Sequence, residues 1–266
     1  MYILDKIMAE KKREVLLRRE QFPEAMLQQS PLFQRQPVSL SAALRADSAS
    51  GIIAEFKRRS PSKGEIRPGA VPEVIAPAYA QGGASGLSVL TDTEFFGGST
   101  ADFLSARAHT TLPMLRKDFI VDAYQLIEAK AMGADVVLLI AECLSAGEVA
   151  DFARQAKDLG MEVLLEVHTA DQVDKFTADI DLIGVNNRNL KTFTVDAGHS
   201  LALFPVLPEE AVKVAESGLR DADILHALYE KGYRGFLIGE WFMQQPDPGG
   251  AVAGLIVEMM ALRQQK

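Results

Sequence analysis

The sequence predicts a (β/α)8 TIM barrel with an N-terminal helical extension, and three observations support this fold class. The chain has 266 residues, 48% of them hydrophobic, and α/β barrels of about 250 residues form a single domain. From Gly51 onward, eight short apolar runs alternate with amphipathic helical stretches. The runs start about 26 residues apart, which is typical of a parallel sheet with right-handed crossovers. We therefore expect one domain over 1–266, with the extension over 1–50 and the barrel over 51–266.

The first 50 residues differ from the rest of the chain. Residues 3–20 place apolar side chains at helical spacing among charged ones, which predicts an amphipathic helix. Its apolar positions are Ile3, Leu4, Ile7, Met8, Val15 and Leu16. A connection with Pro23, Pro31 and Pro37 leads to a second short helix over 39–44. Because so few residues cannot form a core, we expect the extension to pack on the barrel rather than form an independent domain.

The predicted strands are short apolar runs bounded by turn-forming or polar sequence. The eight runs are 52–57, 86–91, 113–117, 134–141, 161–167, 182–187, 212–217 and 235–239. Helical stretches at 123–133, 145–160 and 221–232 lie between them and end in glycine. Glycine at that point is typical of a helix C-cap. The alternation therefore supports a barrel of eight strand–helix units.

The main alternative fold is a doubly wound open sheet. Such a sheet normally shows a G-x-G-x-x-G motif after its first strand, and here that place holds KRRSPSKG (57–64). The end of the chain also favours the barrel. A short helix over 240–245, stopped by Pro246 and Pro248, precedes a final helix from about 250 to 262. A short extra helix after the eighth strand is typical of barrels that bind phosphate.

The composition argues against several function classes. The net charge of −8 argues against a general nucleic-acid binder, and no apolar run reaches the ~18 residues of a membrane span. The N-terminus lacks the continuous apolar segment of a secretion signal. The single Cys143 excludes an internal disulfide and a multi-cysteine zinc site. The four histidines show no metal-ligand spacing. We therefore expect a cytoplasmic globular protein that binds no metal, membrane or nucleic acid.

Candidate catalytic residues lie at the ends of five predicted strands, where barrel enzymes place their chemistry. Glu55 and Lys57 are two apart in the first strand, so they point to the same side. The others are Lys117, Glu166, Asn186, Asn187, Glu216, Ser217 and Gly218. Any one of them alone is equally well explained by a salt bridge at the rim. Together they indicate a site, because buried charges are costly unless they are paired or used.

The loops after the last two strands suggest a phosphate site. They contain Ser217-Gly218 and Gly239-Glu240. Glycine lets the backbone approach an anion closely, and a helix N-terminus offers free N–H groups. The alternative is that these residues are ordinary helix caps.

The segment IIAEFKRRSPSKGEI (52–66) closely resembles the signature of the indole-3-glycerol phosphate synthase family. The resemblance continues in the family's order over nearly the whole chain, including the helical extension. The matching segments are TDTEFFGGS (91–99), LRKDFIVDAYQ (115–125), GADVVLLIA (133–141), LLEVH (164–168), GVNNRNL (184–190), VAESG (214–218) and FLIGE (236–240). The resemblance implies a carboxy-lyase of tryptophan biosynthesis. Such an enzyme converts 1-(2-carboxyphenylamino)-1-deoxyribulose 5-phosphate into indole-3-glycerol phosphate, CO₂ and water.

The resemblance also implies roles for individual residues. Lys117 would be the general acid for ring closure, Glu166 the general base, and Glu55 and Lys57 an ion pair at the substrate. The remaining assignments are Asn186 and Ser217 for orienting hydroxyl groups and catalytic side chains, Arg188 for the substrate carboxylate, Phe96 for the aromatic ring, Glu216 for substrate binding, and Ser60, Gly218, Gly239 and Glu240 for the phosphate. Some family members have Ser where this chain has Glu240, so the role of that side chain stays open.

The implied reaction explains why such groups are needed. An ammonium at the ribulose carbonyl drives ring closure if burial or neighbouring cations lower its pKa, which is the expectation for Lys117. Closure creates an iminium that accepts the electrons released with CO₂, so no cofactor is expected. The basic loop 58–64 would act as a lid, although a solvated run of charges is an alternative for Arg58 and Arg59. Lys57, Lys117 and Arg188 are expected to make the mouth positive.

Two other functions compete with this one. Phosphoribosylanthranilate isomerase, another phosphate-binding barrel, uses a Cys and an Asp, whereas the first strand here carries Glu55. A non-catalytic phosphosugar-binding barrel or assembly subunit predicts loss of a catalytic residue, and none is lost. We expect a monomer that acts on a small phosphorylated substrate. We also expect His168 to form a cap or lie on the surface, Cys143 to pack as an apolar residue and Trp241 to anchor the core.

Overall fold

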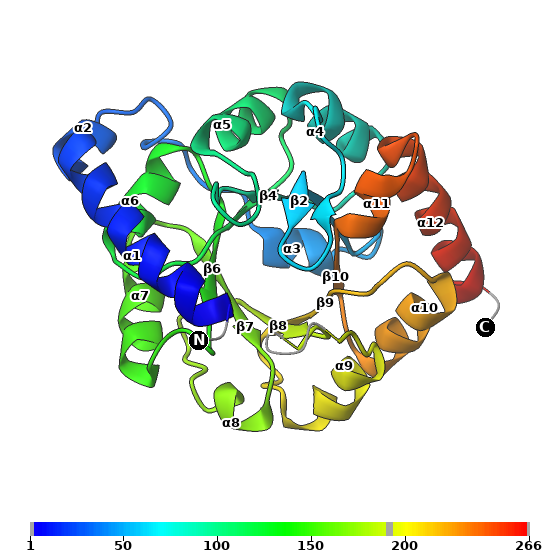
Figure 1. The fold of residues 1–266 in the computed structure, drawn as a ribbon. Coiled ribbons are helices and arrows are strands. Elements are labelled where there is room, and N and C mark those ends of the chain that lie inside the picture. Colours follow the sequence, from blue (N-terminus) through cyan, green and yellow to red (C-terminus); the bar gives the residue numbers. More distant parts are fainter. Residues whose placement is uncertain (1–2, 190–193, 265–266) are drawn as a thin grey trace.

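The computed structural model describes residues 3–189 and 194–264. Eight parallel strands close into a barrel in the order β1-β10-β9-β8-β7-β6-β5-β4 (Figure 1). Their bounds are β1 (Ile52–Phe56), β4 (Gly86–Leu90), β5 (Met114–Lys117), β6 (Val136–Ile140), β7 (Glu162–Val167), β8 (Leu182–Asn186), β9 (Val212–Glu216) and β10 (Gly235–Ile238). The predicted (β/α)8 barrel and all eight of its strands are confirmed.

Helices surround the barrel, as Figure 1 shows. Their bounds are α4 (Pro72–Gln81), α5 (Thr100–His109), α6 (Tyr124–Ala131), α7 (Ala146–Asp158), α8 (Ala170–Val173), α9 (Gly198–Leu203) with the 3₁₀ turn η1 (Phe204–Val206), α10 (Ala222–Lys231), α11 (Glu240–Gln244) and α12 (Pro248–Arg263). The three predicted glycine caps, Gly133, Gly160 and Gly232, have φ values of 80°, 77° and 124°. Glycine adopts this left-handed backbone at little cost, so these helices end where the sequence predicts.

One predicted helix boundary is wrong. Pro248 does not stop a helix but occupies the first turn of α12, and the side chain of Asp247 accepts a hydrogen bond from the Gly250 amide as the N-cap. Proline is well tolerated at that position because its missing N–H would have no partner in the first turn. The last helix therefore begins at Pro248, two residues before the predicted start.

The extension forms α1 (Ile3–Gln21), the single turn α2 (Glu24–Leu27) and α3 (Leu40–Arg45). The helices predicted over 3–20 and 39–44 are confirmed, and α2 was not predicted. Leu40 and Leu44 of α3 are buried in the apolar cluster inside the barrel, with Ile53 and Val136. In Figure 1, α3 lies behind the barrel whereas α1 crosses its front. The extension therefore packs on both ends of the barrel.

The basic loop after the first strand contains a small antiparallel hairpin, β2 (Arg59–Ser60) with β3 (Gly64–Glu65). The Arg58 guanidinium donates two hydrogen bonds, of 2.6 and 2.7 Å, to Asp102. Arg59 donates to the backbone carbonyls of Thr93 and Glu94. These arginines therefore anchor the base of the hairpin, and the alternative of a solvated charge run is wrong for them. Lid closure stays a prediction.

Candidate active site

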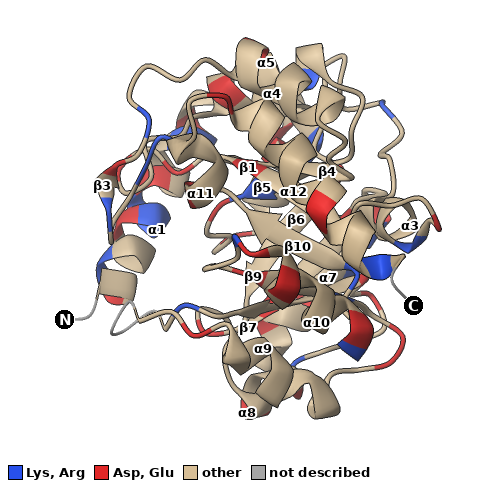
Figure 2. Cartoon of the chain, turned by 90° about the vertical axis from the view of Figure 1, so that its right-hand side faces the viewer, with Lys and Arg blue, Asp and Glu red and all other residues tan. Residues whose placement is uncertain are grey.

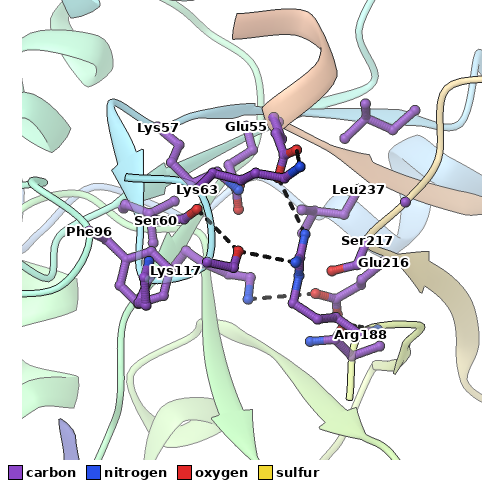
Figure 3. Close-up of a pocket in the computed structure, with 18 of the residues that line it drawn as sticks. Glu55, Lys57, Ser60, Lys63, Phe96, Lys117, Arg188, Glu216, Ser217 and Leu237 are labelled. Carbon is purple, nitrogen blue, oxygen red and sulfur yellow. Dashed lines mark hydrogen bonds and ion pairs between the residues drawn. The ribbon is translucent and has the colours of Figure 1, made fainter. Parts of the chain in front are cut away.

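A cavity of about 490 Å³ opens at the carboxyl ends of the strands (Figure 3). All thirteen residues that the sequence predicts for the catalytic and substrate-binding site line this cavity. They come from strands and loops spread over the whole barrel, and the parallel strands bring them to one end. Leu190, the last residue of the motif at 184–190, lies outside the described residues.

Lys117 is the central cation of the cavity. At the end of β5, its Nζ lies 3.0 Å from Glu166 Oε2 on β7 and 3.6 Å from Glu216 Oε2 on β9. Both carboxylates are buried, each with a side chain 2% exposed, while the Lys117 side chain is 15% exposed. A single ammonium therefore faces two carboxyl groups inside a largely closed site.

This arrangement changes the proton affinities of all three groups. Burial disfavours the Lys117 ammonium, but the attraction of Glu166, Glu216 and Glu55 outweighs burial and raises the pKa of Lys117. The expectation of a lowered lysine pKa is therefore wrong, because carboxylates surround it rather than cations. Burial, together with the charges of Glu166 and Glu55, raises the pKa of Glu216 to about 8 against the pull of Lys117. Burial also opposes the Glu166 carboxylate, but Lys117, His168 and Asn186 outweigh it and lower the pKa of Glu166.

Glu55 and Lys57 form the predicted ion pair, with 2.6 Å between Lys57 Nζ and Glu55 Oε1. Figure 3 shows both side chains beside the cavity. Gly239 packs directly against this pair, since a Cβ at that position would lie 2.4 Å from Glu55 Oε1. No larger residue fits there without moving Glu55, so Gly239 lets the loop after β10 approach the ion pair.

Asn186 holds the second oxygen of Glu166. Its Nδ2 donates to Glu166 Oε1 at 3.0 Å, and its Oδ1 accepts from the Arg188 amide at 2.9 Å. Asn187 binds the next loop, because its Nδ2 donates to the Ser217 carbonyl at 3.2 Å. Both predicted asparagines therefore orient neighbouring groups of the site.

The loop after β9 has an unusual backbone at the predicted phosphate residues. Ser217 has a φ of 68° and Gly218 a φ of 72°. A non-glycine residue in this region costs roughly 1–3 kcal/mol and is typical of functional sites. The strained serine supports a functional role for this loop beyond an ordinary cap.

The Glu240 carboxylate is directed toward the cations at the mouth. Its Oε2 lies 3.3 Å from Arg188 Nη2 and its Oε1 3.8 Å from Lys63 Nζ. Arg188 also donates to Ser62 Oγ at 3.1 Å, which connects the β2–β3 hairpin to the opposite side of the cavity (Figure 3).

The lining of the cavity mixes charges of both signs. Five basic and five acidic residues line it. Acidic and basic residues also occur together on the surrounding helices and loops (Figure 2). The raised pKa of Glu216 leaves that carboxyl mostly protonated at pH 7, so the described lining carries a small positive charge before a substrate binds.

An apolar wall faces these charges, and the sequence did not predict most of it. Phe96 was predicted, and its ring lies 6.0 Å from that of Phe119. Ile3, Leu4 and Ile7 of the extension also line the cavity. Their helical spacing was visible in the sequence, but the face that covers the cavity depends on where α1 docks.

Three predictions outside the main site have different outcomes. His168 is neither a surface residue nor a cap: its side chain is 11% exposed, and its Nε2 lies 3.6 Å from Glu166 Oε1. Cys143 packs against both apolar clusters, as expected. Trp241 packs against the core beside Phe242, with ring centroids 5.2 Å apart, and it also lines the cavity.

No group of three or more His, Cys, Asp or Glu side chains in 3–189 and 194–264 is arranged to hold a metal ion. Within the same residues, no helix combines the length and the apolar character that a membrane crossing requires.

Known proteins resemble this chain over almost its whole length. The family model described as indole-3-glycerol phosphate synthase matches residues 4–255. An indole-3-glycerol phosphate synthase of Bacteroides thetaiotaomicron is 50% identical over 247 residues, which are 93% of this chain and 95% of the relative. That of Laribacter hongkongensis is 46% identical over 258 residues, 95% of this chain and 98% of the relative. The chain therefore belongs to the indole-3-glycerol phosphate synthase family, the carboxy-lyases of tryptophan biosynthesis.

Proposed function

We propose that the chain converts 1-(2-carboxyphenylamino)-1-deoxyribulose 5-phosphate into indole-3-glycerol phosphate, CO₂ and water, with Lys117 and Glu166 as the central acid and base. The observation that carries this proposal is the Lys117 ammonium 3.0 Å from Glu166 and 3.6 Å from Glu216 in one cavity. A proton donor and a proton acceptor in contact suit a reaction that needs both.

The two sides of the cavity suit the two ends of such a substrate. Phe96, Phe119 and the α1 side chains offer an apolar wall for the carboxyphenyl ring. Arg188 and Lys57 would bind the ring carboxylate. The phosphate would bind near Ser60 and the backbone of Gly218, Gly239 and Glu240, where the glycines allow close approach.

Ring closure begins when Lys117 donates a proton to the ribulose carbonyl oxygen. The ring carbon that bears the carboxylate forms a bond to the carbonyl carbon, and the carbonyl becomes a hydroxyl. The substrate nitrogen then carries an iminium charge. When the C–CO₂ bond breaks, its electron pair neutralises that iminium, so the substrate itself takes up the electrons.

Dehydration needs a second pair of proton transfers. Glu166 removes the proton from the carbon next to nitrogen, while Lys57 protonates the departing hydroxyl. The contact between Lys117 and Glu166 couples the two stages. Once Lys117 has given up its proton, Glu166 loses the cation that lowers its pKa and becomes a stronger base.

The rival isomerase finds no support in the site. Its chemistry would need a cysteine at the cavity, and Cys143 is not among the described lining residues. The binding-only reading is disfavoured by the preserved Lys117–Glu166 pair.

Turnover of the carboxyphenylamino substrate, followed by the fluorescence of the indole product, tests the proposal. We expect indole-3-glycerol phosphate and CO₂ in equal amounts. A folded protein that makes no indole product would disprove the catalytic function.

We also propose that the enzyme is a monomer and works in the cytoplasm. All groups of the proposed mechanism come from one chain, and the single cysteine suits a reducing compartment. Light scattering after gel filtration tests the monomer: a mass of two chains that persists on dilution would contradict it.

A further inference from the structure

His168 is a buried titratable residue that the mechanism above does not use. It follows β7 directly and lies two residues after Glu166. Residues two apart on extended backbone point to the same side. The imidazole accordingly lies beside the carboxylate, with Nε2 3.6 Å from Glu166 Oε1.

No hydrogen bond of the ring accounts for the burial of His168. Both ring nitrogens are buried and form no hydrogen bond with the described residues. The backbone, by contrast, is well held, because the His168 amide donates to Gln172 Oε1 at 2.7 Å and its carbonyl contacts His199 Nε2 at 2.7 Å. Burying an unpaired polar ring costs stability, so an apolar side chain would fill this space better if packing were its only role.

The charges that face His168 come from four elements. Glu166 is on β7, Glu142 follows β6, Lys117 ends β5, and His199 is on α9. Asp196 lines the same polar cavity behind the carboxylate. Burial and the positive charge of Lys117 outweigh the two glutamates and lower the pKa of His168 below its usual 6.5. The ring is therefore mostly neutral at pH 7 and gains its charge only at a pH below the usual range of histidine.

We propose that His168 is a positioning residue for Glu166: its neutral ring leaves the carboxylate free for proton transfer, and its protonated ring pairs with the carboxylate and holds it away from the substrate. This inference rests on the proposed role of Glu166 as the base. As the pH falls, a positive charge forms 3.6 Å from Glu166 Oε1 and weakens the base before Glu166 itself is protonated. The acidic limit of activity therefore follows the protonation of His168.

The pH profile of kcat/KM in the His168→Gln variant tests this inference. Glutamine stays neutral at every pH, so the acid limb no longer follows His168 but the protonation of Glu166, whose pKa is lowered. The limb should therefore move to lower pH by about one to two units, since the reference pKa of Glu lies about two units below that of His. Each variant is normalised to its own maximum. The substrate phosphate titrates near pH 6 but contributes equally to all profiles, so it cancels in the comparison.

His199→Gln is the matched control, because it removes an imidazole that contacts the His168 carbonyl. His199 lowers the pKa of His168, so its loss leaves the acid limb in place or moves it upward. An unmoved limb in His168→Gln, or the same downward shift in both variants, overturns the inference.

Proton NMR of the four histidines gives a test that needs no turnover and no His168 variant. Glu166 favours the charged form of His168, so Glu166→Gln lowers the pKa of the His168 resonance by about one unit. An unchanged resonance overturns the inference. A protein that shows this coupling but no turnover would contradict the proposed function alone.

Discussion

Lys117 and Lys11 both lie among carboxylates near the end of β5, but one faces the cavity and the other is enclosed in the protein interior. Lys117 points into the cavity toward Glu166 and Glu216. Asp118, the next residue, points to the other side of the strand, where its Oδ1 lies 3.0 Å from the Nζ of Lys11 on α1. Lys11 also contacts Asp92 at 2.9 Å. Lys117 at the end of β5 and the residue that follows it thus belong to two separate ion clusters.

The Lys11 cluster is closed and balanced. The side chains of Lys11 and Asp92 are each 1% exposed. Burial opposes the Asp118 charge, but Lys11 and Arg116 outweigh it and lower the pKa of Asp118 well below its usual value. In the cavity, by contrast, Glu216 keeps a raised pKa of about 8. A buried ion cluster stabilises the fold when each carboxylate has a cation beside it. A cluster suits proton transfer when one of its carboxyl groups keeps a raised pKa and a substrate can reach it.

The largest expected effect is on catalysis at Lys117. Lys117→Met should lower kcat by at least ~10²-fold and up to ~10⁴-fold, the range of one acid–base group, measured by the fluorescence of the indole product. Lys157→Met is the control, since Lys157 is an exposed lysine paired with Asp181 at 2.6 Å. A near-wild-type rate in Lys117→Met would remove this lysine from the mechanism.

The second effect is on stability at Lys11. Lys11→Met leaves Asp92 and Asp118 buried without this cation, so the free energy of unfolding should fall by about 3 kcal/mol. Urea denaturation measures the loss. We expect kcat per folded molecule to fall much less than in Lys117→Met. A Lys11→Met variant that keeps its stability but loses its activity would contradict a structural role for Lys11.

The third effect concerns the pH dependence of stability at Glu216. Its folded pKa of about 8 exceeds the ordinary 4.5, so the folded state binds more protons between these values. The stabilisation is complete below pH 4.5 and is lost as the pH rises through 8. Glu216→Gln should flatten this decline, by about 3.5 kcal/mol between pH 5 and 8, in urea midpoints measured across the range. A decline of equal size in both proteins would contradict the raised pKa.

The smallest effect is expected at Glu240. Its side chain is 25% exposed, and its partners Arg188 and Lys63 are 19% and 54% exposed. Exposed ion pairs contribute about 0–1 kcal/mol. Glu240→Ser frees both cations for the anionic substrate, so KM should fall by about threefold, a change within that range. Glu65→Gln, an exposed charge on the β2–β3 hairpin that carries Lys63, is the control, and a rise in KM would show that Glu240 orders the site instead.

Much of the site could be predicted from the sequence, because in a parallel barrel every residue at the carboxyl end of a strand lies at the same mouth. Glu55, Lys117, Glu166 and Glu216 all stand near the ends of apolar runs. Parallel strands bring such ends together whatever the intervening helices contain. The chain order of polar residues was therefore enough to assemble them.

The tertiary structure decided the properties that depend on neighbours far apart in the chain. The prediction for the Lys117 pKa had the wrong direction, because Glu166 and Glu216 follow it by 49 and 99 positions. His168 was predicted at a surface or cap position because the pattern after a strand does not show how the next loop folds. The docking of α1 turned Ile3, Leu4 and Ile7 into a wall of the cavity.

The sequence by itself determined the barrel, its strand ends and the set of residues at the mouth, because local periodicity and parallel topology specify them. Only the tertiary structure decided which of these residues carry a proton and which face Glu166. Proton affinity depends on burial and on distances of a few ångströms between charges, and those distances exist only once the strands have closed.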